Sequence, residues 1–243
     1  MPDLPSAFLE IDLAPSDRAA GLIFDSATLG KFDTGEFAGG RGWVDVTADL
    51  LSASCERGIS ASERLYATAD AGTLEADLRN QNGQYDPTNE DSPYWNTLGG
   101  HTELAPMRRV RVRVEADGVD VPPAPYLIWS GFADSFELSY EAGGAVATAT
   151  LHATDALKVL ANVEVALTLI SQQSGSEIAR ILDEARWTAR SLAVGTLTIA
   201  TAEIADNAWA AAQLVAETEL GALYPDGFGN IVFRDRDAAA DEL

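Results

Sequence analysis

Polar and apolar side chains alternate with a period of two along much of the chain. In the segment 109–115, three valines alternate with three arginines, Arg109, Arg111 and Arg113. This alternation is typical of a β-strand with one buried and one solvated face. We expect further strands in these segments: 8–13, 43–47, 64–68, 73–78, 126–132, 135–140 and 146–153. Glycine, proline and asparagine separate these short strands, which is typical of a β-barrel or β-sandwich.

The pattern changes to that of α-helices at Asp155. This residue is placed to cap a short helix, and Ser174 or Ser176 is placed to cap a second helix with one apolar face over 177–186. A third helix is expected at 207–220. Short strands are expected between and after the helices, at 196–201, 222–224 and 230–234.

The two patterns define two domains. We predict a mainly β protein, with a β-barrel domain at 1–155 and a smaller α+β module at 156–243. Inside the first domain, residues 15–42 are rich in glycine, aspartate and serine. A segment of this length without periodic apolar positions predicts a long loop that becomes ordered against a partner.

The charge of the chain narrows its possible functions. The 243 residues include 38 acidic and 16 basic side chains, for a formal net charge of -22. Wrapping of DNA and docking on anionic membranes both need clustered lysine and arginine, so this charge argues against either function. The acidity is explained either by solubility or by a surface that must not bind passing polyanions.

The sequence gives no sign of export or membrane insertion. No apolar run approaches the length of a membrane span, and the first ten residues lack the basic and apolar regions of a signal peptide. Cys55 is the sole cysteine, so no internal disulfide can form. We expect a soluble chain made in the cytoplasm.

Few residues are suited to catalysis. The only histidines are His101 and His152, which lack the paired spacing of a metal site, and no phosphate-binding loop is present. The run 80–86 imitates the first half of a calcium loop, but Asp91 stands where a bidentate glutamate is needed. We therefore predict a turn there, no catalytic or metal site, no cofactor and no enzymatic activity.

A protein of a different class is the alternative. Tyr94, Trp95 and Trp129 could form an aromatic platform for sugars, and the many acidic residues include candidates for a hydrolytic pair. The alternative is therefore a carbohydrate-binding or glycan-active β domain.

The most distinctive motif lies between the strand at 73–78 and the strand at 109–115. Its residues are Asn80, Asn82, Gly83, Tyr85 and Pro87. They fit a strand followed by a tight turn at Asn82-Gly83 and an extended piece that proline ends. The motif resembles that of minor tail proteins of long-tailed, siphovirus-type bacteriophages, in particular tail-hub or baseplate-hub proteins of actinobacteriophages.

Four other segments resemble the same family in the same order along the chain: 43–47 with Arg57-Gly58, 128–132, 151–157, and 217–224 with 232–234. One motif position departs from the family, because Gln84 stands where arginine is usual.

The resemblance implies a structural virion protein at the phage tail tip. Members of this family have tail-tube-like β-barrels with α/β modules, and residues 156–243 would be part of a second barrel or a hub insertion. The family forms a ring that closes or extends the tail tube and joins the distal tail protein to tip or fibre proteins. The implied partners also include the tape measure protein and further copies of the chain, with a homotrimer favoured over a hexamer.

The resemblance also gives the charged residues a function. DNA would pass through such a ring without specific binding, and an acidic lumen would repel its phosphates. The face with Arg109, Arg111 and Arg113 is either solvated or an inter-subunit face that pairs with acidic residues of a neighbour.

Overall fold

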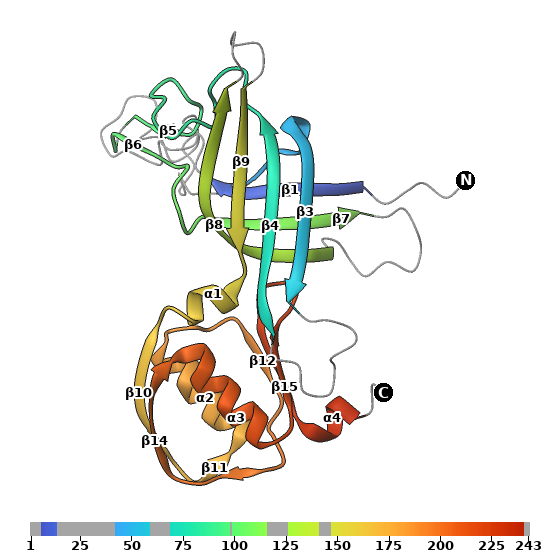
Figure 1. Cartoon of the computed structure of the whole chain (residues 1–243), viewed down its shortest axis with the longest axis vertical. Coiled ribbons are helices and arrows are strands. Elements are labelled where there is room, and N and C mark those ends of the chain that lie inside the picture. The colour runs from blue at the N-terminus through green and yellow to red at the C-terminus, as the bar shows by residue number, and fades with distance from the viewer. Residues whose placement is uncertain are drawn as a thin grey trace, which may run out of the picture. The chain divides into compact units, whose positions relative to one another are not determined.

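The computed structural model of the chain describes residues 6–13, 42–58, 69–97, 99–115, 126–140 and 147–240 (Figure 1). The loop predicted at 15–42, apart from Gly42, and the strand predicted at 64–68 lie outside these residues.

The chain divides into two compact units. Unit 1 comprises Met1–Cys55 and Leu74–Ala153, and unit 2 comprises Glu56–Thr73 and Thr154–Leu243. The segment Glu56–Thr73 therefore groups with the C-terminal residues, although it lies far from them in the sequence.

Unit 1 is built on a seven-stranded sheet with the strand order β2-β1-β7-β8-β9-β4-β3. Its strands are β1 (Ser6–Leu13), β2 (Gly42–Asp45), β3 (Leu50–Gly58), β4 (Asp70–Arg79), β7 (Arg109–Glu115), β8 (Tyr126–Tyr140) and β9 (Ala147–Thr154). The 3₁₀ turn η1 (Thr47–Asp49) precedes β3, and the short strands β5 (Trp95–Asn96) and β6 (His101–Thr102) form a separate hairpin.

Strand β8 belongs to two layers of this sheet. Its first half pairs with β7 as far as Phe132, and its other neighbour is β9. Figure 1 shows β1 and β7 crossing β9, β4 and β3 at a steep angle, with β8 curving from one layer into the other. The sequence predicts two strands here, separated near Gly131. That prediction is wrong, because Gly131 pairs with Val110 and the strand continues.

The apolar positions of the predicted strands fill the space between the two layers. Val110 on β7 is fully buried, and Val112 is buried as well. From the opposite layer, Leu74 and Leu78 on β4 and Leu151 on β9 reach the same apolar cluster. The period-two pattern thus identified the core side of β7 correctly.

Among the described residues, unit 2 contains the helices and three small sheets. Its elements are α1 (Ala156–Leu160), β10 (Glu164–Leu169), β11 (Gln172–Gln173), α2 (Ser174–Glu184), β12 (Arg190–Leu192), β13 (Thr198–Ile199), β14 (Ala202–Asn207), α3 (Ala208–Thr218), β15 (Ala222–Pro225), β16 (Ile231–Arg234) and α4 (Arg236–Ala240). The sheets are formed by β10 with β14, by β11 with β13, and by β12, β16 and β15. The predicted fold class, mainly β with a smaller α+β part, is confirmed.

Helices α2 and α3 form the core of unit 2. Ile178, Ile181 and Leu182 on α2 are fully buried in one cluster with Ala212 and Val215 on α3. Figure 1 shows β10, β14 and β11 curving around these two helices. None of the described helices is both long and apolar enough to cross a membrane.

Side chains cap two of the helices where the sequence predicts helix starts. Asp155 caps α1 by accepting a hydrogen bond from the Leu157 N–H, and Asn207 caps α3 through the Ala210 N–H. The start of α2 differs from the prediction. Ser174 lies inside that helix, and no side chain caps the N-terminus.

The Asp155 carboxylate also holds the beginning of β4. Its Oδ2 accepts a hydrogen bond of 2.8 Å from the Gly72 N–H, and its Oδ1 accepts one of 3.0 Å from the Leu157 N–H. A Cβ at Gly72 would lie only 2.7 Å from Oδ2, so the close approach requires glycine. Burial raises the pKa of Asp155 to about 6, although these backbone hydrogen bonds oppose the shift.

The pKa of Asp155 predicts how this carboxyl affects stability. The folded protein binds the proton more tightly than the unfolded chain, whose carboxyl has a pKa of 3.8. The contribution of Asp155 to the free energy of unfolding should therefore decrease as the pH rises from about 4 to about 7. A carbon-13 NMR titration should give Asp155 a midpoint near 6. Asp77, whose pKa is lowered, should titrate below its usual range, and equal midpoints would contradict the prediction.

Candidate functional site

The layer formed by β8, β9, β4 and β3 has one face that points away from the core. On β4, Leu74, Ala76 and Leu78 are buried, so Thr73, Glu75, Asp77 and Arg79 lie on the opposite face. On β9, Ala149 and Leu151 are buried, and Thr148, Thr150 and His152 lie opposite. Two rows of contacts across the strands define this face.

The first row centres on Asp77. Its Oδ1 accepts a hydrogen bond of 2.7 Å from the Thr150 hydroxyl, and its Oδ2 accepts one of 2.8 Å from the Ser52 hydroxyl. These bonds, that from Thr150 first, lower the pKa of Asp77. The carboxylate is therefore fixed in position and stays charged at neutral pH.

The second row centres on His152. Its Nδ1 lies 3.8 Å from Oε2 of Glu75, and its Nε2 lies 3.7 Å from Oε2 of Glu137. Both glutamates are largely exposed. His152 therefore joins β4 to β8 and leaves both carboxylates facing solvent.

These residues together form what we call the acidic sheet face: Ser52, Thr73, Glu75, Asp77, Glu137, Thr148, Thr150 and His152. Arg79 lies at its end, on the last residue of β4. Hydroxyl groups and carboxylates dominate the face, and the side chains named here include no large apolar group. Such a surface repels polyanions and offers no platform on which nucleic acid bases can stack.

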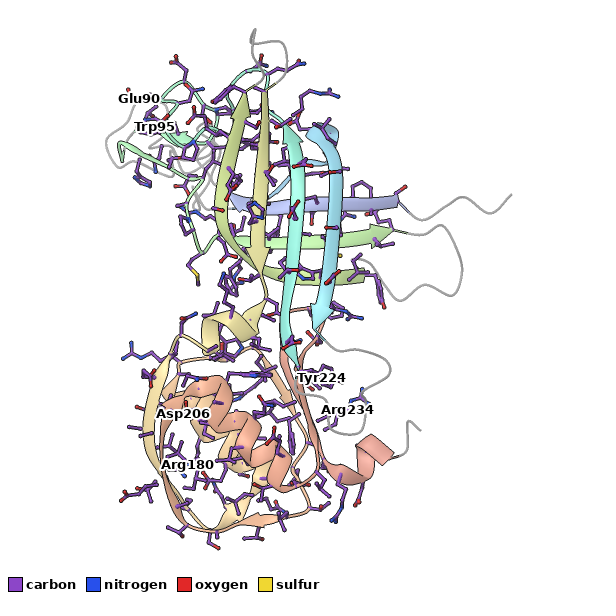
Figure 2. The ribbon with its side chains drawn as sticks, in the orientation of Figure 1. Glu90, Trp95, Arg180, Asp206, Tyr224 and Arg234 are labelled. Carbon is purple, nitrogen blue, oxygen red and sulfur yellow. The ribbon has the colours of Figure 1, made fainter. Side chains whose placement is uncertain are left out.

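The motif residues lie on a run of linked turns that follows β4. Backbone hydrogen bonds join every third residue from 80 to 95, each N–H donating to the carbonyl three residues earlier. Gly83 has a φ of +66°, which favours glycine, so the predicted turn is present. The extended piece predicted around Pro87 is wrong, because the turns continue through it. Glu90 and Trp95 lie on this turn segment (Figure 2).

Side chains fasten the turn segment to the rest of unit 1. Asn80 Oδ1 accepts a hydrogen bond of 2.9 Å from the Tyr85 N–H. Tyr85 is fully buried, stacks on Tyr94 and donates its hydroxyl to Oδ2 of Asp49 at 2.9 Å. Burial is the main reason why the pKa of Tyr85 is raised. Gln84 Nε2 donates to the same Asp49 oxygen at 2.7 Å, so glutamine supplies the donor that this carboxylate requires.

The structure brings Asn80, Gly83 and Tyr85 together but leaves Asn82 exposed and Pro87 half-buried. The oxygens of the calcium-like run do not converge on a common point. Asp86 Oδ1 accepts hydrogen bonds from Thr88, while Asn80 Oδ1 accepts one from Tyr85. No group of three or more metal-binding side chains occurs within the described residues.

Two of the three arginines of β7 are paired inside the chain. Nε of Arg111 lies 2.5 Å from Glu10 Oε2, and Nε of Arg113 lies 3.3 Å from Glu10 Oε1. Their guanidinium groups also stack on aromatic rings, Arg111 on Trp43 and Arg113 on Phe8.

The third arginine, Arg109, is exposed. Among the described residues, it has no ion-pair partner, unlike Arg111 and Arg113. The inter-subunit role of these arginines stays a prediction. Sequence reasoning missed Glu10 as their partner, although its alternation with Leu9 and Ile11 places it on the solvated face.

The predicted aromatic platform for sugars is not formed. Trp129 is 1% exposed and Tyr94 is 8% exposed, so both contribute to the core, and only Trp95 is partly accessible. His101 lies on strand β6 of the β5–β6 hairpin, and its Nε2 is 3.4 Å from Oε1 of Glu103.

The fold, and not the sequence, relates this chain to proteins of known structure. No known protein family matches the sequence, and no curated protein matches it. Solved structures do match. The tail protein from Neisseria meningitidis MC58 has a TM-score of 0.53 at 9% identity, over 94% of this chain and 50% of that protein.

The 43 kDa tail protein of prophage MuSo2 from Shewanella oneidensis has a TM-score of 0.51 at 14% identity, over 96% of this chain and 56% of that protein. At these identities the likeness shows the fold alone. The chain spans about half the length of the two tail proteins.

Removal of the Tyr85 hydroxyl tests how the turn segment is held. Tyr85→Phe should destabilise the chain by about 1–2 kcal/mol, because the buried hydrogen bond to Asp49 is lost. Tyr140→Phe is the matched control, since its hydroxyl bonds to Asp86 at the surface. It should cost less than about 0.5 kcal/mol. Urea unfolding of the full chain measures both, and equal costs would contradict this account of the segment.

Proposed function

We propose that the chain is a structural subunit of a phage-type tail tip, acting as a tail hub. In this proposal, copies form a ring that closes or extends the tail tube and joins the distal tail protein to tip or fibre proteins. The ring lets DNA pass, and the protein is located in the virion tail. The acidic sheet face, on a fold shared with tail proteins, is the observation that carries the proposal.

The ends of the β8–β9–β4–β3 layer support ring formation. Strand β3 is an edge strand, and its residues from Leu51 to Arg57 are exposed on both sides. Its central residues Ser52, Ala53 and Ser54 are uncharged, and Leu51 is 48% exposed. Natural edge strands usually carry charges, prolines or bulges that prevent pairing. The stretch from Leu51 to Cys55 has neither charges nor prolines, and the charged Glu56 and Arg57 lie only near the end of β3. This stretch is therefore suited to pairing with another chain.

The other end of the layer offers a second edge. The pairing of β8 with β7 extends as far as Phe132, which lies opposite Arg109. Beyond it, Ala133 makes two more backbone hydrogen bonds, with Met107 and Arg108, just before β7. Among the described strands, β9 is the neighbour of the remaining residues of β8. If β3 of one copy pairs with this part of β8 in the next, the contact is head to tail, which gives a ring when the rotation between copies closes. The ring would be a trimer or, in the alternative, a hexamer.

The acidic sheet face would then line the channel. Asp77 remains ionised because two hydroxyl groups donate to it, and Glu75 and Glu137 are exposed. Fixed negative charge along the lumen keeps the phosphate backbone of DNA from adhering during passage.

The proposed function includes no catalysis. The buried carboxylates of the described residues all have structural partners: Glu10, Glu103, Asp155, Glu177 and Glu219 bind arginine, serine, threonine or backbone N–H groups. Such groups are held in place and are not free to exchange protons with a substrate. A hydrolase screen on bacterial glycans should detect no turnover, and any turnover would contradict this part of the proposal.

Proline in β3 tests ring formation. Successive N–H groups of an edge strand alternate between the sheet and solvent, so one of Ala53→Pro and Ser54→Pro should leave the pairing with β4 intact. That variant should fold as the wild type and fail to form rings, as measured by light scattering and electron microscopy. Rings formed by the folded proline variant would contradict the use of this edge.

Neutralising the acidic sheet face tests the lumen assignment. Glu75→Gln, Asp77→Asn and Glu137→Gln, combined, should slow DNA ejection from virions that carry the variant, because repulsion of the phosphates is reduced. The control combines Glu90→Gln, Glu184→Gln and Glu203→Gln, which removes the same charge from exposed residues elsewhere. Ejection rates that are equal in the two variants would show that the face does not line the channel.

A further inference from the structure

A second surface, in unit 2, is organised around the buried Glu219. Its Oε1 accepts hydrogen bonds from the N–H and the hydroxyl of Thr196, at 2.7 and 3.1 Å. Its Oε2 accepts a short hydrogen bond from the Ser174 hydroxyl. Glu219 is 2% exposed and Ser174 is fully buried. This carboxylate therefore joins three segments: the start of α2, the end of α3 and the chain between β12 and β13.

The backbone of the joined segments is also fixed. The Ser174 N–H donates to the carbonyl of Leu197, and the Gly175 N–H donates to the carbonyl of Val194. Gly195 has a φ of +86°, and a Cβ there would lie 2.8 Å from Glu219 Oε2. The segment from Val194 to Leu197 therefore follows one path with little freedom.

This rigid support presents apolar side chains to solvent. Val194 is 64% exposed, Leu197 is 39% exposed and Leu220, the residue after Glu219, is 53% exposed. We call these three residues the Leu220 patch. The carbonyls of Val194 and Leu197 accept hydrogen bonds from Gly175 and Ser174, and Leu220 follows Glu219, so the backbone of all three is anchored to the same network. Exposed apolar side chains that gather on a rigid support are typical of interaction sites.

The backbone at Leu220 is unfavourable for leucine. Its φ is +61°, in the left-handed region, where the Cβ is crowded. The Leu220 N–H donates to the carbonyl of Glu217, and the Gly221 N–H donates to the carbonyl of Ala216. These two hydrogen bonds define a Schellman motif, in which the position of Leu220 is usually occupied by glycine. Leu220 is thus both strained and exposed, and glycine would suit the fold of the chain alone better.

The end of α2 provides a comparison. Arg186 has a φ of +58°, and the hydrogen bonds of its own N–H and of the Trp187 N–H repeat the pattern seen at Leu220. Both helices therefore end in the same motif with a residue other than glycine. At α2 that residue is a solvated arginine, whereas at α3 it is an exposed leucine.

Charge indicates what covers the Leu220 patch. The chain has 38 acidic residues, yet none occurs from Trp187 to Ala202, and the run 170–176 has no charged residue at all. The exposed Glu217, one turn before Leu220, accepts a hydrogen bond from Gln213. A second copy carries the same net charge of -22 and is repelled wherever carboxylates meet. Two copies that dock patch to patch bring few charges together, as the centre of an interface requires.

We propose that the Leu220 patch is a docking surface whose occupant is the same patch of a second copy of this chain. The inference does not depend on the proposed tail-hub function, because it uses neither the edges of the large sheet nor the acidic sheet face.

Leu220→Gly in the full chain separates docking from folding. The variant removes the apolar side chain and relieves the left-handed backbone, so its urea midpoint should rise while its self-association weakens at least about tenfold in Kd. Arg186→Gly is the matched control, because it relieves the same strain at α2. Its midpoint should also rise, with Kd unchanged. Sedimentation equilibrium measures the self-association. A variant that failed to fold would have a lower urea midpoint, so it could not give the expected combination of a higher midpoint and weaker association.

Salt and a second substitution complete the test. Contact between apolar patches of two acidic chains should tighten as salt screens their repulsion, and Val194→Ser should weaken it in the same direction as Leu220→Gly. A wild-type chain that stays monomeric at high concentration and high salt would overturn the proposal. Association that Leu220→Gly leaves unchanged, or that salt weakens, would overturn it as well. The proline variants of β3 should keep this contact, so failure of the ring and failure of the patch are distinguishable.

Discussion

The arrangement of unit 1 depends on one strand that pairs with two layers in turn. Strand β8 bonds to β7 through its first half and continues beside β9, so the layers are joined by an unbroken backbone. A single strand that bends fixes the angle between the layers more firmly than two strands and a loop would. Within the described residues, the pairing with β7 ends near Ala133, before the second half of β8. The same constraint therefore sets the core, the polar face of one layer and the edges available to a neighbour.

Carboxylates fasten the structure in a chain where acidic residues are in large excess. Glu10 holds two arginines from a neighbouring strand, Asp155 holds the start of β4 to α1, and Glu219 joins three segments of unit 2. Burial of a carboxylate without a donor would cost several kcal/mol. Each of these carboxylates accepts hydrogen bonds or ion pairs from two or more donor groups, so its oxygens have partners although they are buried.

Part of this architecture could be read from the sequence. Alternation identified the buried side of β7, and the spacing of polar residues identified Asp155 as the cap of α1. These features are local, because period and capping depend on residues a few positions apart. Strand β3 was missed for a physical reason. Both of its faces are exposed along most of its length, so no alternation of polar and apolar residues marks it.

The functional surfaces could not be predicted in the same way, because they depend on register between distant strands. Asp77 meets Ser52 and Thr150, which are 25 and 73 residues away, and Arg111 meets Glu10 at a separation of 101 residues. A shift of one residue in any of these strands would send the side chains to the opposite face. The burial of Trp129 likewise follows from how the layers cross, and composition alone suggested an exposed aromatic ring.

The distribution of charge matters more than its total. Asp77 is held by two hydroxyl groups on a flat polar face, where its charge is fixed and accessible. Near Leu220, the stretch from Trp187 to Ala202 has no acidic residue, and the carboxylate of Glu219 is buried and bound. A net charge of -22 repels every other copy of the chain at long range. In the proposed assemblies, contact between copies is then restricted to places where the backbone edge or an uncharged patch can outweigh that repulsion, so the acidity itself would select which surfaces assemble.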